Sequence, residues 1–436
     1  MSKKGSSERN VLKDGKNIHT LYDEVFEGKD GLINKLPSII REGVFQRVGD
    51  YSSLDKMKKI RGYDFNEGVD YEKVIKTYIH SGCQATYVGE AIKIMNEMIN
   101  WRLSDEDISK EKDERYLDPE VRADTRCTIF LGYSSSMISS GMREIMRFLV
   151  QHKMVDAVVA TAGGIEEDIC KVYSDFYQGD FGYDGVELRS KCINRVGNIF
   201  IPNSAYDGFE YTMVKVINEM QDEQDKNGTI FGPSDVINRL GKHVNHEDSV
   251  YYWCYKNNIP VFSPAFTDGA VGDILYCNQF QRPGFVVDMN QDLYKINMMA
   301  INAKKSGMLT FGAGVTKHHI LNANSMRNGA DYAIYVNNAV EHDSSDSGAL
   351  PSEAVTWGKL AFDSLSTKIH GDATLVLPLI IGESFAKNVE KASRLPKYRN
   401  QKAVDVENKV LETTVVRRAY KASKIARFAR RACILF

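Results

Sequence analysis

The chain has 436 residues and 43% of them are apolar, which suffices for the core of one large domain or of two to three ordinary ones and excludes disorder throughout. The formal net charge is −2, but the residues from Lys387 onward carry 14 Lys or Arg against 4 Asp or Glu, a net +10 that leaves −12 for the rest. An acidic body favours cationic substrates or a basic partner and argues against nucleic-acid binding.

The apolar pattern along the chain predicts an α/β fold. Residues 1–60 are polar, with one helix-like stretch from Leu32 to Phe45, and form an N-terminal extension. Further helices are predicted over Val69–Ile79, Ala85–Trp101 and Ile138–Gln151 and from Glu166 onward. Short apolar strands are predicted over Cys127–Leu131, Asp156–Thr161, Gly197–Ile201, Pro260–Pro264, Gly284–Val287, Met308–Phe311, Asp331–Val336 and Ala373–Leu377.

Short buried strands that alternate with helices indicate a doubly wound, Rossmann-like architecture. It consists of a mostly parallel sheet with helices on both faces, preceded here by a helical N-terminal region. We place this single domain at residues 61–390 and a basic C-terminal extension at residues 391–436. Ligands of such sheets bind beyond the carboxyl ends of the strands, so the loops at those ends are the candidate sites.

The cysteines and the apolar runs predict a cytoplasmic location. Seven cysteines are scattered without C-x-x-C spacing, and an odd number in a chain without a secretory signal indicates reduced thiols. The longest apolar run, Thr374–Ile381, is far shorter than a membrane span and contains a proline. No integral membrane contact is therefore expected.

Four loops after predicted strands are rich in Gly, Ser and Asp: Gly132–Ser136, Thr161–Asp168, Thr267–Asp273 and Phe311–His319. Such residues let a nucleotide phosphate approach backbone amides at a helix N-terminus. Neither the G-x-G-x-x-G fingerprint nor the Walker sequence occurs, so the common nucleotide motifs are absent. Four acids in these loops would attract a cation, although carboxylates also suit the first turn of any helix; they are Glu166, Glu167, Asp268 and Asp273.

The stretch from Glu341 to Lys359 combines acids, hydroxyls, one indole and one lysine. The face of Trp357 can hold a cation or an alkyl chain, and four carboxylates accept hydrogen bonds from ammonium groups: Glu341, Asp343, Asp346 and Glu353. A polyamine is the natural occupant. Lys359 would repel it unless it reacted with it, because a desolvated lysine beside other cations loses its proton readily and suits Schiff-base chemistry. The alternative is a solvated acidic loop before an ordinary helix start.

Histidines offer two further interpretations. His318 follows a Gly-x-Gly turn, and an imidazole there suits proton transfer in amine chemistry, although a lone histidine is more often structural. His243 and His246 have H-x-x-H spacing but no neighbouring carboxylate or cysteine ligands, so no metal site is expected. The absence of a G-x-S-x-G elbow argues against a serine hydrolase.

Taken in order, these segments resemble deoxyhypusine synthase over about residues 61–390. The matching segments are Arg61–Asn66, Gln84–Thr86, Phe130–Tyr133, Thr161–Asp168, Ser249–Trp253, Phe262–Ala265, Thr267–Gly269, Lys317–Ile320, Met326–Tyr332, Ser345–Gly348, Glu353–Val355 and Trp357–Lys359. The resemblance implies that NAD oxidises spermidine to an imine, that Lys359 displaces diaminopropane, and that the 4-aminobutyl group passes to a lysine of the translation initiation factor 5A precursor. The stored hydride then reduces the product to deoxyhypusine.

The resemblance also implies the binding residues and the assembly. His318 would be the proton carrier, and the polyamine would contact Glu166, Glu167, Asp273, His318, Ser344, Ser345, Asp346, Glu353 and Trp357. NAD would contact Ser135, Ser136, Ser139, Thr161, Ala162, Gly163, Glu167, Asp268, Gly312, Ala313, Gly314, Asn338, Ala339, Asp372 and Ala373. Two dimers would form a homotetramer whose sites are completed by neighbouring chains, with the N-terminal extension over the entrance.

Three residues on the implied NAD surface depart from the family pattern. Ser136 replaces asparagine, Ala313 replaces glycine and Asn338 replaces threonine. A methyl group at position 313 would crowd the cofactor, which leaves open a regulatory subunit that activates a separate catalytic chain. Retention of Lys359 and His318 argues for an active enzyme. Homospermidine synthase, which passes the aminobutyl group to a small amine such as putrescine, stays open as well.

The C-terminal residues exceed the usual end of the family at about residue 392. The last four, from Cys433 to Phe436, have the C-a-a-X form that suits geranylgeranyl transfer, and basic residues precede them. We favour the alternative that this basic tail binds an acidic patch of a neighbouring chain or of the protein substrate.

Overall fold

A computed structural model of the chain describes residues 22–27, 29–44, 54–312 and 314–411. The expectations for Ala313 and for the tail with Cys433 lie outside the described residues. The chain divides into two compact units, Met1–Lys59 and Ile60–Phe436. The helical stretch predicted from Leu32 is confirmed in the first unit, whose elements are η2 (Asp23–Glu27), η3 (Leu32–Lys35), α2 (Ser38–Val44) and η4 (Leu54–Lys56).

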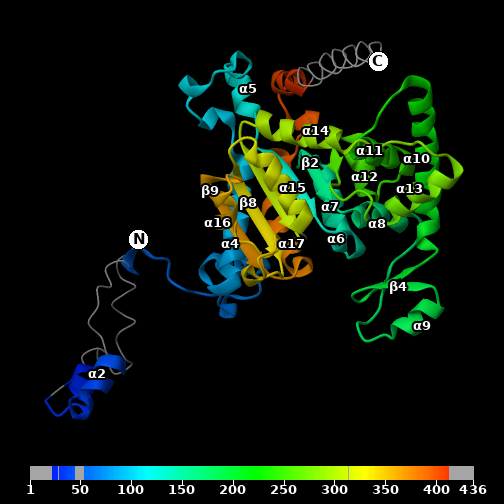
Figure 1. Cartoon of the computed structure of the whole chain (residues 1–436). Coiled ribbons are helices and arrows are strands. Elements are labelled where there is room, and N and C mark those ends of the chain that lie inside the picture. The colour runs from blue at the N-terminus through cyan, green and yellow to red at the C-terminus, as the bar shows by residue number, and fades with distance from the viewer. Residues whose placement is uncertain (1–21, 28, 45–53, 313, 412–436) are drawn as a thin grey trace, which may run out of the picture. The chain divides into compact units, whose positions relative to one another are not determined.

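The second unit is built on a six-stranded parallel sheet (Figure 1). Its strands are β1 (Thr128–Tyr133), β2 (Ala157–Ala160), β6 (Val261–Phe262), β7 (Ser306–Phe311), β8 (Ala330–Asn337) and β9 (Leu360–His370). Across the sheet they run β6-β2-β1-β7-β8-β9. Numbered along the chain this is 3-2-1-4-5-6, the order of dinucleotide-binding Rossmann sheets. The predicted doubly wound fold is confirmed.

Helices precede, connect and follow these strands. Before the sheet come η5 (Phe65–Glu67), α3 (Tyr71–Thr77), η6 (Tyr78–His80), α4 (Cys83–Asn100), η7 (Leu103–Asp105), η8 (Ile108–Lys110), η9 (Glu114–Tyr116) and α5 (Pro119–Asp124). Between strands lie α6 (Ser136–Ser139), α7 (Arg143–Gln151), α8 (Ala162–Tyr173), α9 (Gly185–Ser190), α10 (Ala205–Asn227), α11 (Pro233–Val244), α12 (Val250–Lys256), α13 (Ala270–Gln281), α14 (Met289–Asn302), α15 (Gly314–Ser325), η10 (Glu341–Asp343) and α16 (Pro351–Thr356). After β9 follow α17 (Ala373–Ile381), η11 (Gly382–Ala386), α18 (Val389–Ala392), η12 (Pro396–Tyr398) and a helix over residues 401–411.

None of the described helices has both the length and the apolar character needed to cross a bilayer. The predicted helices near Val69–Ile79 and Ala85–Trp101 are confirmed as α3 with η6 and as α4. The helix predicted from Glu166 begins earlier, at Ala162, because Gly163 and Gly164 form its first turn instead of a preceding turn.

Successive side chains of a strand point to opposite faces of the sheet, and here both faces are buried. Ile129 and Leu131 of β1 belong to the core formed with α4, α7, α8 and α17. Phe130 between them belongs to a second core, formed with α14, α15 and α16. Strands buried on both faces appear in the sequence as continuous apolar runs, which is why β1 could be predicted.

A second, antiparallel sheet lies between α8 and α10 in the chain, with the order β3-β5-β4. Its strands are β3 (Tyr177–Gln178), β4 (Ile193–Val196) and β5 (Ile199–Pro202). In Figure 1, β4 and α9 project beyond the end of α10. The strand predicted over Gly197–Ile201 is therefore present, but it forms a hairpin with β4, and Gly197 at φ +61° makes the turn.

Two predicted strands are wrong, and three observed strands, β3, β4 and β9, were not predicted. Residues 284–287 form only a single bridge, between Val287 and Phe231. Ala373–Leu377 begins the buried helix α17, because Asp372 caps its N-terminus by accepting the N–H of Thr374; a short apolar run alone does not distinguish helix from strand. In the main sheet the missed strand is β9, an edge strand whose polar side chains break the apolar pattern.

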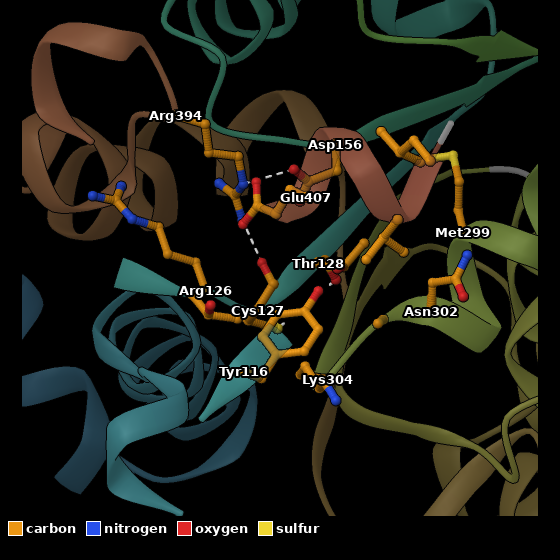
Figure 2. A pocket seen from close by; sticks show the side chains of 14 residues that line it. Tyr116, Arg126, Cys127, Thr128, Asp156, Met299, Asn302, Lys304, Arg394 and Glu407 are labelled. Carbon is orange, nitrogen blue, oxygen red and sulfur yellow. Dashed lines mark hydrogen bonds and ion pairs between the residues drawn. The ribbon is translucent and has the colours of Figure 1, made fainter. Parts of the chain in front are cut away.

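Residues 391–411 pack against the amino edge of the main sheet. Arg394 forms an ion pair with Asp156 at 2.7 Å and donates hydrogen bonds to the carbonyls of Met154 and Cys127. Figure 2 shows this ion pair beside a small cavity of about 130 Å³, which Glu407 from the helix over residues 401–411 also lines. This segment is held by buried polar contacts as part of the folded body.

Candidate active site

The carboxyl ends of β1 and β7 mark the point where the strand order reverses. The chain runs from β1 to β2 and β6 on one side, and from β7 to β8 and β9 on the other. Ligands of such sheets bind in the crevice outside this point. Helices α8 and α15 begin there, directly after β2 and β7, and their N-terminal N–H groups carry partial positive charge that suits a phosphate.

The backbone at this edge is packed so closely that only small residues fit. A Cβ atom at Gly312, which has φ +83°, would lie 2.4 Å from Oγ of Ser134, and one at Gly163 would lie 3.0 Å from Cβ of Ser135. The loops after β1 and β2 are joined by Oγ1 of Thr161, which accepts the N–H of Ser135 at 2.9 Å. Glycine backbone and hydroxyl groups at helix N-termini fit the pyrophosphate of a dinucleotide.

The structure brings the predicted cofactor residues to this edge, apart from Ala313. They follow β1 (Ser135, Ser136, Ser139), β2 (Thr161, Ala162, Gly163, Glu167), β6 (Asp268), β7 (Gly312, Gly314), β8 (Asn338, Ala339) and β9 (Asp372, Ala373). Ser136 and Asn338 are two of the residues for which the resemblance implied a departure from the family pattern. The hydroxyl of Ser136 lies 2.9 Å from that of Ser134, and the carbonyl of Asn338 lies 2.8 Å from the ring of His370.

Two buried carboxyl groups, Glu166 and Glu167, lie in the first half of α8. Burial is the main cause that raises the pKa of each to about 7. The carboxylate of Glu166 accepts the N–H of Val271 at 3.2 Å, which opposes the rise, while Asp273 adds to it. Glu167 accepts a hydrogen bond from the hydroxyl of Ser139. Buried carboxyls that titrate near neutrality are suited to a cationic ligand, because an ammonium group stabilises their charged form.

Asp168, the next residue, fixes the position of α8. Its buried carboxylate pairs with Arg143 at 2.7 Å, accepts the hydroxyl hydrogen of Ser249 at 2.6 Å and accepts the N–H of Val250 at 3.1 Å. These bonds tie α8 to α7 and to the start of α12. Asp168 therefore holds Glu166 and Glu167 in place rather than facing a ligand.

A cavity of about 400 Å³ lies among α15, β8 and α16. His318 and Asp346 meet there, with 2.8 Å between Nδ1 and Oδ1. Nζ of Lys359 lies 5.6 Å from the centre of the Trp357 ring. The lining residues are Lys317, His318, Leu321, Asn322, Tyr335, Asp346, Ala349, Leu350, Glu353, Ala354, Trp357 and Lys359. The cavity thus combines an amine, an imidazole, carboxylates and an indole face, which are the groups that chemistry on an ammonium ligand requires.

Lys317 and Tyr335 line the cavity and were not predicted as site residues from the sequence. Lys317 is 1% exposed, donates to the carbonyl of Ala349 at 3.1 Å and lies 4.5 Å from the centre of the Tyr335 ring. Burial, followed by the nearby Lys368, lowers the pKa of Lys317 to about 8. The buried hydroxyl of Tyr335 has no hydrogen-bond partner among the described residues. The available signals were a tyrosine within an apolar strand and a lysine beside His318.

The predicted amine-binding residues fall into two sets on one chain. The first lies on the β2 side and consists of Glu166, Glu167 and Asp273; none of them lines the cavity. The second lines the cavity and consists of His318, Asp346, Glu353 and Trp357. Ser344 and Ser345 are not lining residues. They shape the loop that carries Asp346, with Ser344 at φ +57° and Oγ of Ser345 accepting the N–H of Gly348.

Comparison with known proteins assigns the family. The sequence profile of deoxyhypusine synthase matches residues 73–384, well over half of the chain. The chain belongs to the deoxyhypusine synthase family. A Dictyostelium discoideum protein named probable deoxyhypusine synthase is 50% identical over 360 residues, which cover 83% of this chain and 94% of that protein. Homospermidine synthase 1 of Senecio vernalis is 46% identical over 341 residues, which cover 77% of this chain and 92% of that enzyme.

A crystal structure of an Entamoeba histolytica protein with the same family name matches this fold with a TM-score of 0.57. It is 35% identical, and the match covers 75% of this chain and 97% of that one. As a member of the deoxyhypusine synthase family, the chain is a transferase of hypusine biosynthesis. The family match contains the main sheet and both sets of predicted amine-binding residues, and it ends at residue 384, before residues 391–411.

Proposed function

We propose that this chain transfers the 4-aminobutyl group of spermidine, through an imine on Lys359, to a lysine of the translation initiation factor 5A precursor. The observation that carries this proposal is the cavity that groups Lys359 with Trp357, Glu353 and the His318–Asp346 pair. Carboxylates and an indole face hold an ammonium ligand, and the lysine supplies a nucleophile at the same place.

Each group has a task in the transfer. His318 donates its Nδ1–H to Asp346. The other ring nitrogen, Nε2, then acts as the base that takes the proton of Lys359. Neutral Lys359 attacks the imine carbon of oxidised spermidine, the bond to the diaminopropane nitrogen breaks, and His318 returns the proton to the leaving amine. The acceptor lysine then attacks the same carbon and releases Lys359. Each step exchanges one imine for another of similar energy.

The cofactor is proposed to lie along the carboxyl edge of the sheet. Gly312, Gly314 and the turn from Thr161 to Gly163 would hold the pyrophosphate of NAD at the start of α8 and α15. When bound, NAD supplies the oxidation of spermidine and the later reduction of the new imine, so that it is not consumed. Glu166 and Glu167 would hold the far ammonium group of the amine and orient it.

We propose that each site is completed by a second chain, within a homotetramer made of two dimers. Two observations support this. Glu166 and Glu167 do not line the cavity that contains Lys359, so one chain presents the two halves of an amine site separately. In addition, Trp357 is 69% exposed beside that cavity, and Phe362 on the edge strand β9 is 95% exposed. Large exposed apolar side chains near a site indicate a surface that another chain covers.

Spermidine should bind more tightly at pH 8 than at pH 6, because Glu166 and Glu167 have raised pKa values near 7. Both carboxyls are largely protonated below that pH and cannot pair with ammonium, and both ionise above it. We expect an affinity gain of about tenfold across this interval, measured by titration calorimetry with NAD present. A variant with Glu166→Gln and Glu167→Gln should bind weakly at both pH values. An unchanged pH dependence in that variant would place the titrating groups elsewhere.

Homospermidine synthase is the second candidate, because a homospermidine synthase matches this chain almost as closely as the deoxyhypusine synthases. The two activities share the amine and cofactor sites and differ in the acceptor. The test supplies labelled spermidine and NAD to the protein and offers the factor precursor and putrescine in parallel. Preferred labelling of the factor supports our proposal. Preferred labelling of putrescine would replace it with the second candidate.

A further inference from the structure

Two buried lysines reach the backbone of the loop between β8 and α16, which we call the acidic loop and define as residues 339–349. Lys317 on α15 is 1% exposed, and Lys368 on β9 is 8% exposed. A lysine is seldom buried this far unless its ammonium group has fixed partners. The partners of both ammonium groups here are backbone carbonyls of the acidic loop.

Lys368 closes the acidic loop from the side of β9. Its Nζ lies 2.8 Å from the carbonyl oxygen of Ala339, at the start of the loop, and 2.5 Å from that of Gly348, near its end. One ammonium group thus joins both ends of the loop. Such charge-assisted hydrogen bonds are shorter and stronger than those between neutral groups.

Lys317, on α15, holds the same loop through a hydrogen bond. Its Nζ donates to the carbonyl of Ala349 at 3.1 Å and lies over the ring of Tyr335. The next residue of α15, His318, bonds to Asp346 of the loop. The loop is therefore held by two elements, α15 and β9. The carboxylate of the loop that lines the cavity is that of Asp346.

Three acidic residues lie in the loop that the two lysines hold. They are Glu341, Asp343 and Asp346. Glu341 and Asp343 act electrostatically on Lys368, and Asp346 acts on Lys317. The two ammonium groups therefore attract the acidic side chains of the loop while their hydrogen bonds fix its backbone.

We infer that Lys317 and Lys368 are positioning residues for amine binding, whose ammonium groups hold the acidic loop so that Asp346 faces the cavity. The inference rests on the proposed function, since it assumes that the ligand is an amine. Neither lysine is assigned a covalent step. Loss of either ammonium group would free the loop, move its carboxylate and weaken the hold on the ammonium ligand more than it slows the chemistry.

The test compares Lys317→Met and Lys368→Met with the wild-type full-length enzyme. Methionine keeps the length of the side chain and removes the hydrogen bonds. We expect each variant to raise the KM for spermidine by about tenfold or more, with kcat at saturating spermidine within about threefold of wild type. Lys368→Arg keeps a donor and should recover most of the affinity. Calorimetric titration of spermidine checks that KM reports binding.

The matched control is Lys304→Met. Lys304 also lies over an aromatic ring, 4.1 Å from the centre of Tyr116, but it belongs to the amino edge of the sheet. The control should leave the KM for spermidine unchanged. Folded Lys317→Met and Lys368→Met variants with a wild-type KM, or with a loss confined to kcat, would overturn the inference while the proposed function stands. A wild-type protein that neither binds spermidine nor transfers its label would overturn the proposed function itself.

Discussion

Replacing Lys359 with arginine will abolish covalent capture of the aminobutyl group. A guanidinium group keeps the positive charge and most of the length of lysine, but it does not lose its proton in proteins and cannot attack an imine. We expect the yield of the enzyme adduct to fall by about a thousandfold or more, as when other catalytic nucleophiles are removed. The measurement incubates the protein with NAD and labelled spermidine, reduces any imine with borohydride and maps the labelled peptide.

The matched control for this experiment is Lys305→Arg. Nζ of Lys305 lies 5.4 Å from the centre of the Trp101 ring, much as Lys359 lies 5.6 Å from that of Trp357, but Lys305 is remote from the cavity. This variant should be labelled like the wild type, on the peptide that contains Lys359. Full labelling of Lys359→Arg, or a label that maps to Lys317 in the wild type, would assign the nucleophile to another residue.

Replacing Arg394 with methionine will destabilise the catalytic unit. Its guanidinium group pairs with Asp156 at 2.7 Å and donates to the carbonyls of Met154, Ala392 and Cys127. Asp156 also accepts the N–H of Ile129, so the ion pair lies between the starts of β1 and β2. Removing one partner of a buried ion pair typically costs about 3–5 kcal/mol, because the other charge and the carbonyls lose their partners.

Thermal melting measures this effect, and we expect the Tm of Arg394→Met to fall by about 5 °C. Arg115→Met is the control, since Arg115 is 42% exposed and pairs with Asp113 at the surface. Exposed ion pairs contribute little to stability, so this control should melt close to wild type. Equal melting of the two variants would show that residues 391–411 add nothing to the folded unit, despite their buried contacts.

The sequence was sufficient to predict the central strands of the main sheet and the edge strand β6, but not the edge strand β9. β1, β7 and β8 are buried on both faces and appear as uninterrupted apolar runs. β9 has a neighbour on one side only, and Phe362 and Asp363 on it are exposed, so its pattern is broken. The apolar run of α17 was taken for a strand because a short buried helix and a short buried strand have the same composition.

The site could be predicted only where the type of a residue indicates the chemistry that it can perform. Lys359 and Trp357 stood out because an amine and an indole next to acids suggest polyamine chemistry. The hydrogen bonds by which Lys317 and Lys368 hold the acidic loop could not be predicted in this way. They are accepted by backbone carbonyls, which every residue has, so the side chains of the loop give no sign of them. The raised pKa of Glu166 likewise depends on burial, which the sequence does not specify.

The most direct test of the account is the mass of the acceptor protein. The full chain and the factor 5A precursor are produced together in a host that lacks this modification, beside a second culture that carries Lys359→Arg, and the precursor is analysed by intact mass and peptide mapping. We predict one aminobutyl group on one lysine of the precursor with the wild-type enzyme and none with the variant. An unmodified precursor beside a folded, NAD-binding wild-type enzyme supplied with spermidine would contradict the proposed transfer.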